Sequence, residues 1–286
     1  MEFNPYAPFE WKLAHGRTLE LGPCSVIMGI LNVTPDSFSD GGRFDHVDAA
    51  LYQARKMKRA GAAIIDIGGE STRPGADQVS AQLEQERALP VIARIAEDMP
   101  DVILSVDTYR ASTAEAAIAA GAHIINDVWG FQKDPEISGV AARSGAGCVI
   151  MHTGRERTRI SDVIEDQMHF LGHSLEIAAN AGIPGDRIVL DPGFGFAKEV
   201  NENIELLARM EELFALGCPI LTGTSRKRFV AALTGKANSR RDNGTAATSA
   251  VARMKGSAVF RVHDVQKNRD ALAVADAVIA SCLERR

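Results

Sequence analysis

Short runs of apolar residues recur along the 286-residue chain, and each run ends in a polar or small residue. Within a run the apolar positions are continuous and do not alternate with polar ones. This pattern is typical of strands buried on both faces, as the parallel strands of α/β proteins are. The strands that it predicts are 26–31, 63–67, 102–106, 123–125, 147–151, 188–190, 219–221 and 258–262.

The segments between the apolar runs are rich in Ala, Leu, Glu, Lys and Arg and have the spacing of helices. Several of them end before a glycine that suits the position after a helix C-terminus, as at Gly61, Gly121, Gly182 and Gly217. The clearest predicted helices are 49–60, 82–98, 162–181 and 203–216.

The repetition of strand and helix predicts an α/β fold, a closed (β/α)₈ TIM barrel. A doubly wound open sheet remains an alternative, because strand order cannot be read from periodicity. No linker or run of charge divides the chain. We therefore expect one domain over residues 1–286, in which residues 1–22 form an N-terminal extension that caps the bottom of the barrel or lies along its side.

Composition narrows the class of protein. The chain is 45% hydrophobic and 24% charged, with a net charge of −5, so no basic field indicates binding to nucleic acid or an anionic membrane. The four cysteines are widely spaced and form no Cys-x-x-Cys pair, so we expect buried free thiols in a reducing compartment. No signal peptide or membrane span is predicted, and we expect a cytoplasmic protein.

Polar and charged residues stand at the ends of the predicted strands or just beyond them, where the active site of a barrel lies. They are Asn32, Asp66, Asp107, Asn126, His152, Asp191, Ser225, Lys227, Arg261 and His263. Any one of them alone could cap the following helix. Together, at one level of the barrel, they indicate a site that binds its ligand through hydrogen bonds.

Three loops after these strands add candidate chemistry. The loop 32–42 is long and polar, the loop 68–75 has paired glycines and an arginine, and residues 223–227 place Arg226 and Lys227 where a helix should begin. Cations at a helix N-terminus are electrostatically unfavourable unless they serve an anion. We therefore expect Arg226 and Lys227 to hold a carboxylate or phosphate.

Two of these loops lie in the strongest motifs. Residues 28–42 (MGILNVTPDSFSDGG) and 64–75 (IIDIGGESTRPG) resemble the first and second signatures of the dihydropteroate synthases. The resemblance spans residues 26 to about 265, and its further motifs are 105–108, 125–127, 191–196, 223–227 and 261–264. It implies a homodimeric barrel that uses Mg²⁺ and condenses 6-hydroxymethyl-7,8-dihydropterin pyrophosphate with p-aminobenzoate, giving 7,8-dihydropteroate and pyrophosphate in folate biosynthesis.

The resemblance also implies roles for single residues. The pterin pocket is expected to contain Asp107, Asn126, Asp191 and Lys227. The pyrophosphate is expected at Asn32, Arg261 and His263, with Asn32 also near Mg²⁺. The p-aminobenzoate site is expected to contain Thr72, Arg73, Pro74, Phe196, Ser225 and Lys227. The expected catalytic residues are Asp107, Lys227, Arg261 and His263, and sulfonamides are expected to compete with p-aminobenzoate.

The sequence departs from the family pattern after the fifth strand. There Met151-His152 leads into 153–157 (TGRER) in place of the usual Met-Gln-Gly-x-Pro, and Trp129 is bulkier than the residue expected at its position. The contacts of this loop cannot be inferred from the family. Two alternatives remain, a folate-binding methyltransferase and a catalytically silent paralogue. The first would have no use for the cationic motifs, and the second would be expected to have lost one of them.

Overall fold

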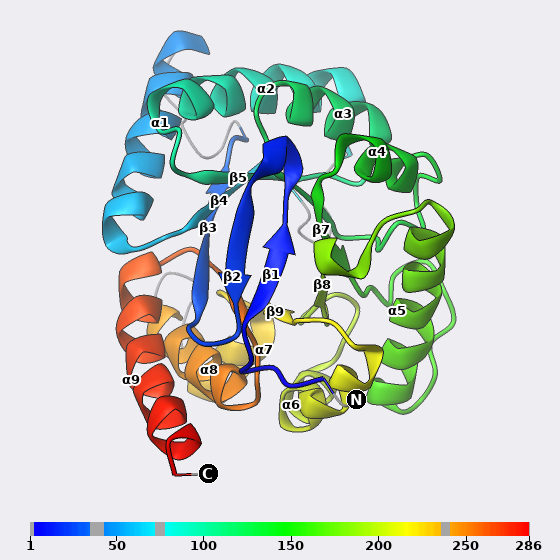
Figure 1. The fold of residues 1–286 in the computed structure, drawn as a ribbon, viewed down its shortest axis with the longest axis vertical. Coiled ribbons are helices and arrows are strands. Elements are labelled where there is room, and N and C mark those ends of the chain that lie inside the picture. Colours follow the sequence, from blue (N-terminus) through cyan, green and yellow to red (C-terminus); the bar gives the residue numbers. More distant parts are fainter. Residues whose placement is uncertain (1–2, 35–42, 72–77, 236–240, 286) are drawn as a thin grey trace.

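The computed structural model describes residues 3–34, 43–71, 78–235 and 241–285. In this part of the chain, eight parallel strands form one sheet that is surrounded by helices (Figure 1). The strands are β3 (Val26–Asn32), β4 (Ile64–Gly68), β5 (Ile103–Asp107), β6 (Ile124–Asp127), β7 (Gly147–Met151), β8 (Ile188–Asp191), β9 (Leu221–Thr222) and β10 (Val259–Val262). Each overlaps one predicted strand, so these predictions are confirmed.

The order of the strands identifies the fold. From β3 to β8 each strand pairs with the next one in the sequence, and β10 pairs with both β9 and β3. The remaining gap between β8 and β9 is bridged at Leu190 and Ile220, where the Leu190 N–H donates to the carbonyl of Pro219 at 2.9 Å. The sheet is therefore a nearly closed (β/α)₈ barrel, and the doubly wound open sheet is excluded.

Helices follow the strands as predicted. They are α1 (Arg43–Ala60), α2 (Ala81–Asp98), α3 (Ala111–Ala119), α4 (Ile137–Ser144), α5 (Val163–Asn180), α6 (Val200–Arg209), α7 (Arg228–Thr234), α8 (Asp242–Met254) and α9 (Val265–Leu283). Side-chain caps begin three of them, because Ser80, Asp162 and Asp264 accept hydrogen bonds from the first-turn N–H groups of α2, α5 and α9. The segment 203–216, predicted as one helix, is instead α6 followed by the 3₁₀ helix η4 (Met210–Leu216).

The N-terminal segment contains a hairpin that the apolar pattern did not predict. The antiparallel strands β1 (Phe9–Lys12) and β2 (Thr18–Leu21) lie across the middle of the ring of helices in Figure 1, in dark blue. Trp11 is fully buried, and its indole N–H donates to the carbonyl of Arg187 at 2.8 Å. Trp11 shares a core cluster with the first residues of the barrel strands, so the hairpin closes the N-terminal end of the barrel.

Two large apolar clusters make up most of the core of the described residues, and a small third cluster contains Val128, Met151 and Phe196. One large cluster fills the layer between strands and helices, and the other fills the N-terminal half of the barrel interior beneath the hairpin. Cys148 and Cys218 are buried free thiols as expected, whereas Cys24 and Cys282 are exposed, and the expectation is wrong for these two. Cys24 and Cys282 lie at the edges of their apolar segments, so the apolar residues beside them do not show whether these two thiols are buried. Among the described helices, none is long and apolar enough to cross a bilayer.

Candidate active site

The polar residues predicted from the strand ends meet at the C-terminal end of the barrel. Asp107 of β5 is level with Asn126 of β6, and Met151 of β7 is level with Asp191 of β8. A cavity lies there between polar and apolar walls. Its lining residues are Asn126, Asp191, Lys227 and Arg261, together with Val128, Met151, Gly193, Phe194, Phe196 and Gly223.

Arg261 connects two carboxylates at this end of the barrel. Its Nε donates to Oδ2 of Asp66 at 2.6 Å, and its Nη2 donates to Oδ2 of Asp107 at 2.5 Å. Asn126 donates to the same oxygen of Asp66 at 3.2 Å. Asp66 is fully buried, and its Oδ1 has no hydrogen-bond partner among the residues that the structure describes. Asp66 therefore belongs to the site, although the motifs assigned it no role.

Burial and shared charge set the protonation of this cluster. Burial and the neighbouring carboxylate of Asp66 together raise the pKa of Asp107 to about 7, against the charge of Arg261. Burial opposes the charge of Arg261, but Asp66 and Asp107 outweigh it and hold the Arg261 pKa above its ordinary value. Arg261 therefore stays a cation, and the protonated form of Asp107 is favoured more than in an exposed carboxyl group.

Asp191 forms the opposite wall of the cavity. Its Oδ1 accepts from the backbone N–H of Gly193 at 2.7 Å, and its Oδ2 lies beside Gly223. Burial raises the pKa of Asp191, while the hydrogen bond from Gly193 and the charge of Lys227 lower it. The cavity thus contains carboxylate, amide and ammonium groups whose donors and acceptors match a polar heterocyclic ring edge.

Phe196 carries cations on its ring. The Nζ of Lys227 lies 4.1 Å from the ring centroid, and the guanidinium of Arg155 lies 4.6 Å from it. Burial, together with the charges of Arg261 and Arg155, lowers the pKa of Lys227 to about 8. Arg155 comes from the loop that departs from the family pattern, so sequence reasoning gave it no role.

Ser225 and His263 form a hydrogen-bonded pair beside Lys227. The Ser225 hydroxyl accepts from the backbone N–H of His263 at 3.1 Å and lies 2.9 Å from Nδ1 of the ring. Burial and the charge of Arg226 lower the pKa of His263 to about 3, so the ring is neutral. A Ser225 proton donated to Nδ1 leaves the Nε2–H of His263 as a donor for an anion.

Three other expectations need qualification. Asn32 Oδ1 and the Asp107 side chain both lie within 4 Å of the point where a Cβ on Gly68 would stand, so Asn32 reaches the rim of the same site. Arg226 does not supply the expected second cation: its side chain donates to both oxygens of Asp242 at 2.8 and 3.1 Å. Among the predicted p-aminobenzoate residues, Thr72, Arg73 and Pro74 lie outside the described part of the chain.

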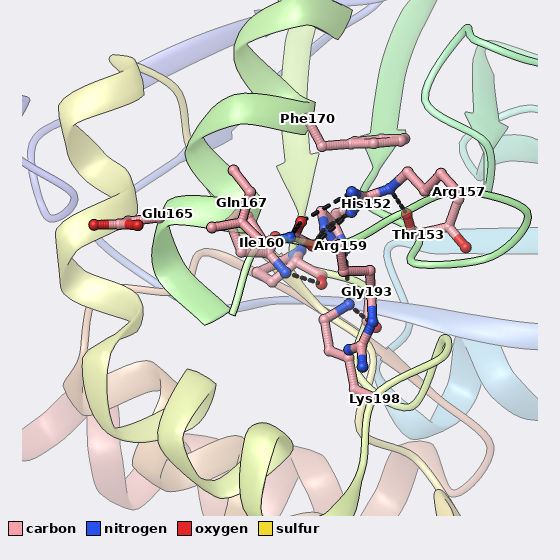
Figure 2. A network of polar contacts seen from close by, with 12 residues as sticks. His152, Thr153, Arg157, Arg159, Ile160, Glu165, Gln167, Phe170, Gly193 and Lys198 are labelled. Carbon is pink, nitrogen blue, oxygen red and sulfur yellow. Dashed lines mark hydrogen bonds and ion pairs between the residues drawn. The ribbon is translucent and has the colours of Figure 1, made fainter. Parts of the chain in front are cut away.

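His152 lies outside this cavity. Its ring is fully buried and contacts the carboxylate of Asp166, the guanidinium of Arg157 and the ammonium of Lys198 (Figure 2). The expectation that it faces the ligand is therefore wrong. The pairing of His152 with Asp166 and Lys198 could not be read from the sequence, since these residues are 14 and 46 positions away.

Comparison with known proteins agrees with this geometry. A family model described as "Pterin binding enzyme" matches residues 28–263. The chain belongs to this family of pterin-binding enzymes, whose match runs from β3 to the residue after β10. It is 46% identical over 255 residues to the dihydropteroate synthase of Bacillus subtilis, covering 89% of both proteins.

Solved structures indicate which of the pterin-binding enzymes the chain resembles. The dihydropteroate synthase of Xanthomonas albilineans, solved with 4-aminobenzoic acid, superimposes with a TM-score of 0.89 at 40% identity, over 95% of this chain and 99% of that one. The Yersinia pestis enzyme, solved with a sulfonamide drug, gives 0.86 at 41% identity over 94% and 98% of the two chains. Within the pterin-binding enzymes, the chain thus belongs with the dihydropteroate synthases, which confirms the predicted resemblance and disfavours a methyltransferase.

Proposed function

We propose that this chain condenses 6-hydroxymethyl-7,8-dihydropterin pyrophosphate with p-aminobenzoate, releasing pyrophosphate and forming 7,8-dihydropteroate for folate biosynthesis. The observation that carries this proposal is the cavity lined by Asn126, Asp191, Lys227 and Arg261, in which Arg261 is hydrogen-bonded to the buried carboxylate of Asp107. Such a site offers acceptors and donors to a pterin edge on one side and cations to an anionic leaving group on the other.

Pterin recognition falls to the buried polar wall. Asp107 and Asp191 can accept hydrogen bonds from ring N–H groups, and Asn126 and Lys227 can donate to the ring's acceptors. Because the wall is buried, an analogue that lacks one of these groups would leave a carboxylate or amide unpaired, which is costly.

Pyrophosphate binding falls to Arg261, His263 and Asn32. The Arg261 guanidinium and the Nε2–H of His263 are donors to an anion. Mg²⁺ takes oxygen ligands and usually keeps waters and substrate phosphates as most of its shell. The side-chain oxygen of Asn32 fits that need. In the described residues, no group of three or more acids, histidines or cysteines offers an all-protein site. When bound, Mg²⁺ would neutralise charge on the pyrophosphate.

The nucleophile pocket combines Phe196, Lys227 and Ser225. An aromatic ring beside an ammonium group suits a benzoate, whose ring can pack on Phe196 while its carboxylate faces Lys227. The aniline nitrogen is uncharged at neutral pH, so attack on the pterin methylene carbon requires no strong base. We add Thr72, Arg73 and Pro74 to the proposed p-aminobenzoate pocket on the family resemblance alone.

The chemical step forms a C–N bond and breaks the C–O bond to pyrophosphate, and the nitrogen then loses a proton. Developing negative charge on the leaving group meets Arg261 and His263 in a preorganised site. If the C–O bond breaks ahead of attack, positive charge spreads into the pterin ring, and Asp107 and Asp191 are placed to stabilise it. We favour this dissociative order.

Release of pyrophosphate on mixing both substrates with Mg²⁺ tests the function. We expect release that requires both substrates and the chain, with stoichiometric 7,8-dihydropteroate. A folded protein that binds both substrates and releases no pyrophosphate would be a silent paralogue. Sulfonamides should raise the apparent KM for p-aminobenzoate without lowering kcat, and inhibition that excess p-aminobenzoate cannot relieve would contradict the assigned pocket.

The quaternary structure, domain organisation and location are also proposals. A homodimer is supported by an exposed apolar surface on α8 and α9, where Val251, Met254, Val274 and Val278 are 44–67% exposed. Sedimentation of the wild type and of Val274→Lys would test the homodimer, and we expect the variant to be a monomer.

The apolar core that the hairpin shares with the barrel supports a single domain. The free cysteines support a cytoplasmic location.

A further inference from the structure

A buried polar network lies behind the loop that joins β8 to α6, outside the cavity lining. Figure 2 shows His152 between Arg157 and Lys198, with the ring of Phe170 beside it. His152 is fully buried and Lys198 is 6% exposed. A lysine ammonium is almost never buried to this degree unless hydrogen bonds or opposite charges offset the cost of removing it from water.

The hydrogen bonds of His152 define its tautomer. The Nζ of Lys198 lies 2.8 Å from Nδ1, and since an ammonium only donates, Nδ1 is the acceptor. The proton of the neutral ring is then on Nε2, where Oδ2 of Asp166 accepts it at 2.9 Å, and Nη2 of Arg157, which lies 2.8 Å from the same nitrogen, donates to Oδ2 of Asp166. Arg157 donates to both oxygens of Asp166, at 2.8 and 2.5 Å. The network thus runs from the Arg157–Asp166 ion pair through His152 to Lys198.

Lys198 connects this network to the active site through the carbonyl group of Gly193. Its Nζ donates to the carbonyl of Gly193 at 2.9 Å, and the backbone N–H of Phe196 donates to the same oxygen at 3.1 Å. The N–H of Gly193 in turn donates to Oδ1 of Asp191. A single lysine therefore supports the turn that carries a pterin-pocket carboxylate at one end and the aromatic ring of the p-aminobenzoate pocket at the other.

The turn needs such support because its backbone is unfavourable. Gly193 has φ +65°, and a Cβ there would stand 1.9 Å from the carbonyl oxygen of His152. Ala197 has φ +52°, a left-handed conformation that costs a residue with a side chain about 1 kcal/mol or more. Such conformations persist where surrounding contacts hold them.

Charge couples the lysine to the pterin pocket as well. The groups that face Lys198 are Asp191 on β8, Asp166 on α5, and Arg157 and Arg159 in the preceding loop. Burial lowers the pKa of Lys198 to about 7, and the two carboxylates oppose that fall. In the other direction, Lys198 lowers the pKa of Asp191 and favours its ionised form.

We propose that Lys198 is a positioning residue that holds the β8–α6 turn through the Gly193 carbonyl and so aligns the pterin and p-aminobenzoate pockets together. His152, Asp166 and Arg157 hold Lys198 in place, which assigns a role to the loop that departs from the family pattern. This inference rests on the proposed function, because the two pockets are defined by its substrates.

Replacement of the lysine by an apolar residue of similar length is the first test. Lys198→Met removes both hydrogen bonds and the charge, and we expect KM to rise about tenfold or more for each of the two substrates. Lys12→Met is the matched control. Lys12 is exposed in the hairpin at the opposite end of the barrel, where it pairs with Asp186, and its variant should leave both KM values unchanged.

Double-mutant cycles separate positioning from a general loss of stability. In an Asp191→Asn background, Lys198→Met should no longer raise KM for the pterin substrate but should still raise it for p-aminobenzoate. In a Phe196→Ala background the pattern should reverse. Unchanged KM values in Lys198→Met, or equal losses for both substrates in both backgrounds, would overturn the proposal.

Should Lys198→Met fail to fold, the outer end of the network provides the same test. Arg157→Gln removes the ion pair with Asp166 at a side chain that is 22% exposed, and we expect both KM values to rise several-fold. Arg143→Gln, at an exposed side chain of α4 that pairs with Glu115, is its control. Equal kinetics of the two variants would contradict the proposal, whereas a wild type that releases no pyrophosphate would contradict the proposed function instead.

Discussion

The two ends of the barrel use the same strands in opposite ways. At the N-terminal end, Trp11, Leu13 and Leu21 of the hairpin seal the interior with apolar contacts. At the C-terminal end, the strands finish in Asp107, Asn126 and Asp191, which are buried with unfavourable desolvation. Stability is therefore concentrated at one end and chemical reactivity at the other. This separation predicts that substitutions at one end should leave the properties of the other unchanged.

Loss of the hairpin's central side chain should have the largest effect. Trp11→Ala empties a fully buried site and removes the hydrogen bond to Arg187, so we expect the free energy of unfolding to fall by about 3–5 kcal/mol. Denaturant titration measures this loss. The KM values and kcat of the folded fraction should match the wild type. A tenfold loss of kcat/KM under conditions where the variant is fully folded would show that the two ends are coupled.

Acid should destabilise the fold through a neutral histidine. Burial and the charge of Lys198 lower the pKa of His152 to about 3, below its ordinary value of 6.5. A depressed histidine pKa gives stability that is present above pH 6.5 and is lost as the pH falls toward 3. At pH 4 we expect this residue to cost about 2–3 kcal/mol relative to pH 7.

The variant His152→Gln tests the assignment, since glutamine does not titrate. Its free energy of unfolding should fall less between pH 7 and pH 4 than that of the wild type. His173→Gln is the control, because His173 is exposed on α5 and pairs with Glu176. If both variants keep the wild-type pH dependence, His152 is not the source of the acid sensitivity.

Asp107→Asn should separate activity from stability at the C-terminal end. A strand-end carboxylate that accepts from the pterin is worth about 1.5–3 kcal/mol, so we expect kcat/KM to fall about ten- to hundredfold. Near-wild-type kcat/KM in the folded variant would contradict the assigned role of Asp107.

The same variant should gain stability at alkaline pH. The pKa of Asp107 is raised from 3.8 to about 7, so its contribution to stability is present below about pH 4 and is lost as the pH rises to 7. Asparagine does not titrate, so we expect the stability of the variant relative to the wild type to be higher at pH 8 than at pH 5, by about 2–3 kcal/mol. Thermal melts at the two pH values would show this difference.

The sequence predicts the barrel better than it predicts the site. Continuous apolar runs are the direct result of burial on both faces, so β3 to β10 could be located from them. The hairpin strands are only four residues long and carry no such run. Motifs located Asp107, Asn126 and Asp191, whose position follows from strand ends alone. The placement of Asp66, Arg226 and His152 depends on which partner each side chain reaches, and that is decided by packing between distant segments.

The smallest effect should come from Arg155, whose role only the structure indicates. Its guanidinium lies over Phe196 on the same ring that Lys227 contacts, and it lowers the pKa of Lys227. A cation over an aromatic ring is worth about 0.5–1 kcal/mol where partly exposed, so Arg155→Gln should raise KM for p-aminobenzoate about two- to fivefold. The pKa of Lys227 should also rise once the neighbouring charge is gone, and the alkaline limb of the rate profile should shift to higher pH with it.

Lys133→Gln is the matched control for Arg155→Gln. The ammonium of Lys133 lies 4.5 Å from the ring centroid of Trp129, and neither of these two residues lines the cavity. If both variants leave KM for p-aminobenzoate and the alkaline limb unchanged, the contact of Arg155 with Phe196 belongs to packing alone.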